Sequence, residues 1–191
     1  MVRHVKQLLT ILCLLILVSC SNEVPVDQLV ERNGVYYEIN SQTPFKGVEV
    51  NYHENGQLEF RKNYKNGIQD GLYEKYYENG QLSSKENLKD GKRDGLNEYY
   101  YENGQLEERR NFKDGKLDGL QEWFRKNGQL KTKGNFKDGE REGLWEWFHE
   151  NGQLKTKGNH KDGKLDGLWE YFDKEGNLTK TKEYKDGVLQ E

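Results

Sequence analysis

From residue 47 onward, hydrophobic and polar positions alternate along the chain, and the alternation restarts every 24 residues. Two turn-forming dipeptides mark each restart, one of the Asn-Gly type and one of the Asp-Gly type. Alternation between such dipeptides predicts two strands of roughly nine residues per unit, joined by hairpin turns. The fixed period predicts a repeat array of six units over 47–190. The first residues of these dipeptides are Asn55, Asn79, Asn103, Asn127, Asn151 and Glu175 in one series, and Asn66, Asp90, Asp114, Asp138, Asp162 and Asp186 in the other.

The register within a hairpin follows from four apolar positions per unit, which fall at Leu144, Phe148, Leu154 and residue 160 or their equivalents. All four are even-numbered, and they share one face of a hairpin only if the loop holds an odd number of residues. A three-residue loop such as 150–152, a type I turn closed by a Gly bulge, meets this condition. It pairs Phe148 with Leu154 and Val50 with Phe60. A two-residue loop would scatter the set over both faces, so we expect the bulged loop and a buried even face.

The odd face is the candidate binding surface, because aromatic platforms beside cations bind sugars, protein side chains or lipid headgroups. The alternative interpretation is structural: both faces of a single-layer sheet need aromatic cover, and lysine stems pack across rings. The expected aromatic residues are Tyr73, Tyr77, Tyr99, Tyr101, Trp123, Trp145, Trp147, Trp169 and Tyr171, with Lys131, Lys133, Lys155 and Lys157 interleaved.

Composition supports an all-β fold. The chain has no alanine, which is the best helix former, and 12% aromatic residues, too many for a disordered chain. Its 30 basic and 33 acidic residues leave a net charge of −3. Nucleic-acid binders carry a cationic excess, so we expect no nucleic-acid partner.

The first twenty residues have the pattern of a targeting signal. Basic residues precede an apolar run over 8–18, which is too short for a spanning helix of roughly 20 residues but typical of a secretory signal. Residues 17–20, Leu-Val-Ser-Cys, resemble the bacterial lipobox. That resemblance implies a signal peptide over 1–19, lipidation of Cys20, and a place in the bacterial cell envelope. Because Ser21 is not Asp, it also implies the outer membrane in a diderm. An ordinary signal peptide cut near Ser19 and an uncleaved anchor are the alternatives.

Residues 20–28 are then expected to be a lipidated cysteine and a flexible tether. The only cysteines are Cys13 and Cys20, so the mature chain has no disulfide and no thiol nucleophile. The four histidines lack metal-ligand or triad spacing. A glutamate ladder is expected to pair with lysines, with divalent cations as the alternative; its members are Glu74, Glu98, Glu122, Glu146 and Glu170. We predict no catalytic residue, no metal site and no cofactor.

The repeat unit reads Gly-Leu-x-Glu-aromatic-aromatic, then Glu-Asn-Gly-Gln-Leu, and ends in Lys-Asp-Gly-Lys. It resembles the bacterial variant of the MORN repeat across about 144 of the 191 residues, 47–190. The resemblance implies an elongated, single-layer antiparallel β-hairpin array opened by a degenerate capping hairpin over 29–46. It implies no established catalysis. The lipid-kinase label of some relatives is not expected to transfer, because the chain lacks a Gly-rich phosphate loop.

Together these features predict a non-enzymatic, membrane-anchored scaffold that binds a protein partner through its aromatic face. A cell-wall or carbohydrate-binding adhesion module is the first alternative. The second is the antitoxin of a toxin–antitoxin system, a label carried by members of the family that the repeats resemble. The third is a module that contacts phospholipid directly.

Overall fold

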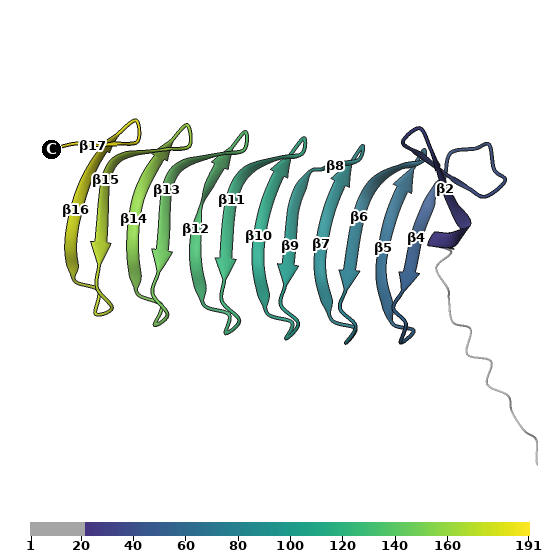
Figure 1. Cartoon of the computed structure of the whole chain (residues 1–191), viewed down its shortest axis with the longest axis horizontal. Helices are drawn as coiled ribbons and strands as arrows, with labels where there is room; N and C mark the ends of the chain where they lie inside the picture. The colour runs from purple at the N-terminus through teal and green to yellow at the C-terminus, as the bar shows by residue number, and fades with distance from the viewer. Residues whose placement is uncertain (1–21) are drawn as a thin grey trace, which may run out of the picture.

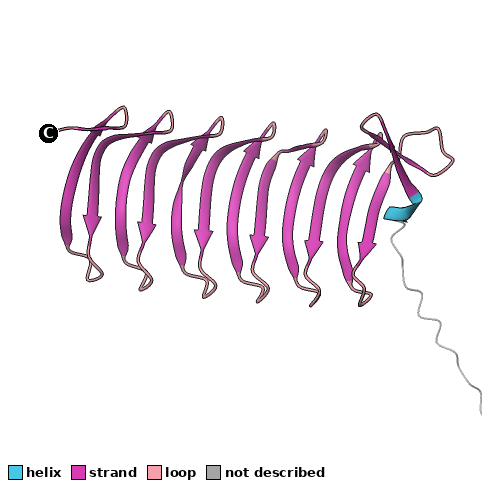
Figure 2. Cartoon of the chain, viewed as in Figure 1, coloured by secondary structure: helices cyan, strands magenta, loops and turns pink. Residues whose placement is uncertain are grey.

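The computed structural model describes residues 22–191, so the predicted signal peptide and Cys20 lie outside the described residues. Within the described range, fifteen strands form one continuous sheet and two more form a hairpin at its amino end (Figures 1 and 2). The elements are β1 (Glu23–Pro25), η1 (Val26–Gln28), β2 (Leu29–Arg32), β3 (Val35–Glu38), β4 (Gly47–Tyr52), β5 (Leu58–Lys65), β6 (Ile68–Tyr76), β7 (Leu82–Lys89), β8 (Lys92–Arg93), β9 (Gly95–Tyr100), β10 (Leu106–Lys113), β11 (Lys116–Phe124), β12 (Leu130–Lys137), β13 (Glu140–Phe148), β14 (Leu154–Lys161), β15 (Lys164–Phe172), β16 (Leu178–Lys185) and β17 (Val188–Leu189).

From β4 to β17 the strands follow one another in chain order, and each pairs antiparallel with the next; the short β8 pairs only with β7. Successive hairpins therefore stand side by side in a long row, with the two kinds of turn along its opposite edges (Figure 1). This arrangement confirms the predicted elongated, single-layer array with two strands per 24-residue repeat.

The two turn series have different geometries. In the Asp-Gly series both residues have positive φ, as in Asp138 (51°) and Gly139 (95°), which makes a two-residue type I′ turn. In the Asn-Gly series the N–H of Gly152 donates to the carbonyl of His149, and the N–H of His149 donates to the carbonyl of Gln153 at 2.8 Å. With φ of 86° at Gly152, this is the predicted three-residue loop closed by a Gly bulge.

A second bulge just beyond that loop reverses which residues of the two strands share a face of the sheet. Phe148 pairs with Leu154 as predicted, but the next pair is Trp147 with Thr156, so residue 155 has no partner. Beyond this bulge, odd residues of the first strand share a face with even residues of the second. The predicted pair of Val50 with Phe60 is wrong for the same reason, because Val50 faces Arg61.

Each hairpin also bends where it meets the hairpin before it. Between the pairs Asn135–Glu142 and Gly134–Trp145, strand β13 carries two extra residues, Gly143 and Leu144. Gly143 has a φ of 69°, a conformation that glycine adopts without steric cost. Leu144 is left 47% exposed, whereas Trp145 on the opposite face is 1% exposed. The predicted buried even face is therefore wrong for the later repeats, whereas Val48 and Val50 in the first repeat are buried as predicted.

We call the face that carries Trp145 the inner face and the one that carries Leu144 the outer face. The inner face also bears Trp147, Thr156 and His160, as the strand pairing requires. Burial concentrates here, since Trp145, Trp169 and His160 are each at most 6% exposed. Beyond the first repeat, where Val48 and Val50 are also buried on the outer face, the core of the array is thus a strip along the inner face.

The amino edge of the sheet is covered. Strand β1 pairs in parallel with β4, and the Phe45 side chain, 2% exposed, packs 5.6 Å from the Tyr64 ring. Residues 23–28, predicted to belong to a flexible tether, instead form β1 and η1. Backbone hydrogen bonds to β4 order this segment, a long-range pairing that local composition does not reveal.

Candidate binding surface on the inner face

One inner-face position runs through all six repeats and contains the most buried side chains. Asn97 and Gln121 are fully buried and Trp145 is 1% exposed. The residue type changes along the array, from polar in the early repeats to tryptophan in the last two. The six residues are Glu49, Tyr73, Asn97, Gln121, Trp145 and Trp169.

Tryptophans form a continuous stack in the carboxyl-terminal repeats. Trp145 lies 5.8 Å from both Trp123 and Trp147, and Trp147 lies 5.4 Å from Trp169, as measured between ring centroids. Neighbouring rings are tilted by only 31–35°, and at these distances they form an offset stack. The Arg141 guanidinium covers the Trp145 ring at 4.4 Å.

His160 sits among these rings, with its centroid 5.3 Å from Trp169 and 5.7 Å from Trp145. Burial lowers the pKa of His160 and the nearby charge of Arg141 lowers it further, because both disfavour a second positive charge. Its Nδ1 atom is buried without a hydrogen-bond partner. The imidazole therefore acts as a neutral member of the aromatic core.

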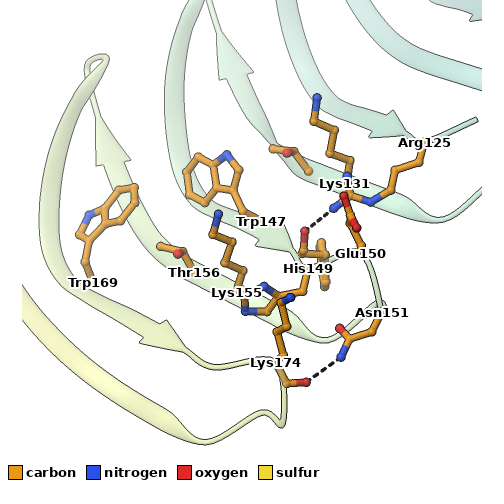
Figure 3. Close-up of a pocket in the computed structure, with 12 residues that line it drawn as sticks. Arg125, Lys131, Trp147, His149, Glu150, Asn151, Lys155, Thr156, Trp169 and Lys174 are labelled. Atoms are coloured by element: carbon orange, nitrogen blue, oxygen red, sulfur yellow. Dashed lines mark hydrogen bonds between the residues drawn. The ribbon is translucent and has the colours of Figure 1, made fainter.

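Beside the stack, at the Asn-Gly turn end of β12–β15, the inner face is hollowed to a volume of about 990 Å³ (Figure 3). We call this the indole hollow. Trp147 and Trp169 supply its aromatic surface, and Thr132 and Thr156 supply hydroxyl groups. Phe148 also borders it, with its backbone carbonyl bound to Arg125. The other lining residues stand nearer the turns: Arg125, Lys131, His149, Glu150, Asn151, Lys155 and Lys174.

Hydrogen bonds between neighbouring turns position this rim. Arg125 donates from Nη2 to the carbonyl oxygen of Phe148 at 2.6 Å, and His149 Nε2 lies 3.0 Å from the carbonyl oxygen of Phe172. Asn151 donates to the carbonyl oxygen of Lys174 at 2.7 Å. Each bond joins a residue to one 23 positions later, so each turn is fastened to the turn of the next repeat. Tyr77 and Tyr101, predicted on the odd face, make the same bond in earlier repeats.

The structure brings together four residues of the predicted surface: Trp147, Trp169, Lys131 and Lys155 all line the hollow. Lys133 and Lys157 do not, and their predicted place beside the tryptophans is wrong. They lie on the outer face and form ion pairs with Glu146 and Glu170, each at 2.8 Å. The bulges at residues 131 and 155 separate the two pairs of lysines, because they reverse the alternation.

The remaining predicted residues lie elsewhere on the inner face. Tyr73 and Tyr99 belong to the amino-terminal repeats, Trp123 joins the tryptophan stack, and Tyr171 pairs with Thr156. Sequence reasoning missed the rim residues outside the aromatic pattern, such as Arg125 and Lys174. Comparing equivalent positions of the repeats would have pointed to this rim, because Glu59 and Glu107 of earlier repeats are replaced by Lys131 and Lys155.

The glutamate ladder lies on the outer face, and four of its five members form ion pairs: Glu146 and Glu170 with the expected lysines, Glu98 and Glu122 with an arginine. Arg109 bridges Glu98 and Glu122 at 3.3 and 3.1 Å, and Lys133 and Lys157 continue the pattern. Across residues 22–191 there is no group of three His, Cys, Asp or Glu side chains that could hold a metal ion. The same part of the chain contains no helix with the length and apolarity to cross a bilayer.

Comparison with known protein families identifies the family of the repeats. No curated protein sequence matches the chain. Six segments match the MORN repeat variant family: 45–66, 69–90, 93–114, 117–138, 141–162 and 165–186. The segments recur at the 24-residue period and cover more than half of the chain. The chain therefore belongs to the MORN repeat variant family.

Proposed function

We propose that this protein is a non-enzymatic scaffold, anchored to a membrane through Cys20, that binds a protein partner at the indole hollow. Membership of a MORN repeat family favours a protein- or membrane-binding module. The observation that carries the proposal is the hollow itself, which opens beside the tryptophan stack and is framed by hydrogen-bonded turns. Partner surfaces with aromatic side chains and a polar rim are typical of protein interfaces.

The packing of the indoles favours a protein partner over a sugar. Sugars stack on open aromatic faces, whereas Trp145, Trp147 and Trp169 form an offset stack with one another. Trp145 and Trp169 are also at most 6% exposed. A partner would meet mainly ring edges, which carry partial positive charge, together with the cationic rim.

The position of β1 gives the anchor a structural consequence. Cys20 precedes the first residue of β1 by three positions, and β1 is held against β4. Three residues span at most about 11 Å, so lipid on Cys20 would hold the amino edge of the sheet close to the bilayer. The hollow lies about nine strand spacings away, or roughly 43 Å along the array.

A site-specific crosslinker tests the binding role in cells. Placed at residue 155 on the hollow rim, it should capture one defined protein; at residue 157 on the outer face, it should not. Trp147→Ala should abolish the product at residue 155 while the thermal transition of the array persists. Equal capture from both positions, or none from either, would refute the binding role.

The anchor is tested separately. Radiolabelled fatty acid should be incorporated into the wild-type chain and not into Cys20→Ser. The variant should move from the membrane fraction to the soluble fraction. Wild-type protein that carries no acyl chain would overturn this part of the proposal and leave the crosslinking result unaffected.

A further inference from the structure

The rim of the indole hollow is strongly cationic in a chain whose formal net charge is −3. Arg125, Lys131, Lys155 and Lys174 line it, and Glu150 is the single acidic lining residue. With histidine neutral, the lining side chains sum to a formal charge of +3 (four positive, one negative). Such a local reversal of sign attracts an anionic ligand and orients its approach.

Earlier repeats reverse or lack this charge at equivalent positions, the second repeat having neutral Ser83 in place of the lysine. Lys131 and Lys155 correspond to Glu107 in the third repeat and to Glu59 in the first. Arg125 corresponds to neutral Tyr101 and Tyr77. The shared backbone therefore does not require a basic rim; the basic residues belong to the same repeats as the tryptophans. An acidic partner is attracted to one end of the array and repelled from the other.

The spacing of the rim lysines suits an extended chain. Lys131 and Lys155 occupy the same position in successive hairpins, two strands apart, which separates their backbones by about 9.6 Å. A polyproline II segment presents every third side chain on one side, with a repeat of about 9.3 Å. Such segments are recognised in aromatic-lined grooves. Acidic residues three positions apart on this segment would each face one lysine.

We propose that the indole hollow binds an extended acidic segment of the partner protein, with carboxylates at every third residue facing Lys131 and Lys155. This inference rests on the proposed binding function and names the chemistry of its partner. Arg125 and Lys174 extend the positive field at the turn edge, and the indole edges contact the apolar parts of the segment. Thr132 and Thr156 offer hydroxyl groups to its backbone.

The test measures fluorescence anisotropy of labelled dodecapeptides with the full chain in nonionic detergent. A (Pro-Pro-Glu)₄ peptide should bind, and its affinity should fall as salt is raised. A (Pro-Pro-Lys)₄ peptide should not bind. Equal binding of the two peptides would overturn the inference, because it would show that charge is not recognised.

Paired variants of one residue type locate the contact. Lys131→Gln with Lys155→Gln should weaken binding by about tenfold, as expected for two exposed charge pairs. Lys133→Gln with Lys157→Gln removes the same charge from the same strands but on the outer face, and it should change binding by less than about twofold. Thermal melts check that both variants fold. Equal losses in the two variants would refute the assigned site.

Two competitors address other anionic ligands. Polygalacturonate, an acidic polysaccharide, and vesicles of phosphatidylglycerol are each added to the peptide complex. The inference requires that neither binds the hollow more tightly than the peptide, and tighter binding by either overturns it. If the crosslinker at residue 155 captures a protein while the acidic peptide fails to bind, this inference fails and the proposed function stands.

Discussion

The amino-terminal and carboxyl-terminal halves of the inner face share one backbone and differ in chemistry. In the first repeat, buried Glu49 accepts a hydrogen bond from the Tyr64 hydroxyl at 2.9 Å and pairs with Lys62 at 3.2 Å. In the fifth repeat, the equivalent residue is Trp145, packed against other rings. The first repeat thus places a hydrogen-bonded charge at the position where the fifth repeat places an aromatic ring.

The residue facing this position accounts for the difference. Gly134 and Gly158 lie directly beneath Trp145 and Trp169, and a Cβ atom on either glycine would come within 2.2 Å of the indole. The equivalent residues of the second and third repeats are Glu86 and Arg110, long side chains that leave no such room. Tryptophan therefore requires glycine on the neighbouring strand, and the two change together.

Glutamine and tryptophan at this position donate a hydrogen bond to the same kind of backbone carbonyl in the preceding repeat. Gln121 donates from its side-chain amide to the carbonyl oxygen of Asn111 at 3.0 Å, and Trp145 donates from its indole N–H to the carbonyl oxygen of Asn135 at 3.1 Å. Each bond satisfies a carbonyl beside the bend of the sheet. The two polar residues at this position nonetheless leave Asn97 Nδ2 and Gln121 Oε1 buried without partners, which costs stability.

The largest effect should come from removing the indole. Trp145→Ala should lower the free energy of unfolding by about 3–5 kcal/mol, because it empties a buried aromatic site. Asn97→Ala, at the same position two repeats earlier, should cost about 1 kcal/mol, since it removes one hydrogen bond and one unpartnered donor. Urea denaturation measures both. Equal costs would show that the two halves do not differ energetically.

A slightly smaller effect is expected from filling the space beneath the indole. Gly134→Arg should destabilise by about 3 kcal/mol through overpacking against Trp145. Adding Trp145→Gln recreates the Arg110–Gln121 pair, which joins the third and fourth repeats, and should recover most of the loss. If the double variant is as unstable as the sum of the singles, the two positions are not coupled.

The bonds between turns should matter less, and alike at two successive turns. Tyr77→Phe removes the hydroxyl that donates to the carbonyl oxygen of Tyr100 at 2.6 Å and should cost about 1 kcal/mol. Tyr101→Phe should cost the same, because its hydroxyl donates to Phe124 at 2.9 Å. Exposed Tyr52→Phe is the control and should be neutral. Hydrogen exchange of the turn amides reports the local loss.

The smallest effect is a pH dependence confined to the aromatic half. Burial holds the pKa of folded His160 below its unfolded value, so protonation favours the unfolded chain. The stability that neutral His160 contributes is therefore complete above the unfolded pKa of about 6.5 and is lost as the pH falls from there toward the folded pKa. His160→Phe, which places at this position the residue type of Phe136 in the preceding repeat, should remove this part of the acid sensitivity. Urea midpoints between pH 8 and pH 5 measure it, and an unchanged slope would exclude His160 as its source.

Some of this structure could be predicted from sequence because its signals are local. Asn-Gly and Asp-Gly mark turns through residues that accept positive φ, and Phe148 meets Leu154 because the loop between them sets their pairing. The bulge at residue 155 has no such signal. This bulge places Lys157 on the outer face, away from the tryptophans, and leaves Lys155 among the residues that line the hollow, although the two lysines are only two positions apart.

By itself, the sequence determined the 24-residue period, the two strands per unit, the places of both turns and the bulged loop of the Asn-Gly series, since each follows from residues within one repeat. The tertiary structure decided which face is buried and where the hollow opens. Burial depends on the alternation of side chains along a strand, which each bulge reverses. The hollow joins residues from β12–β15 and their turns, and only the pairing of successive hairpins brings them together.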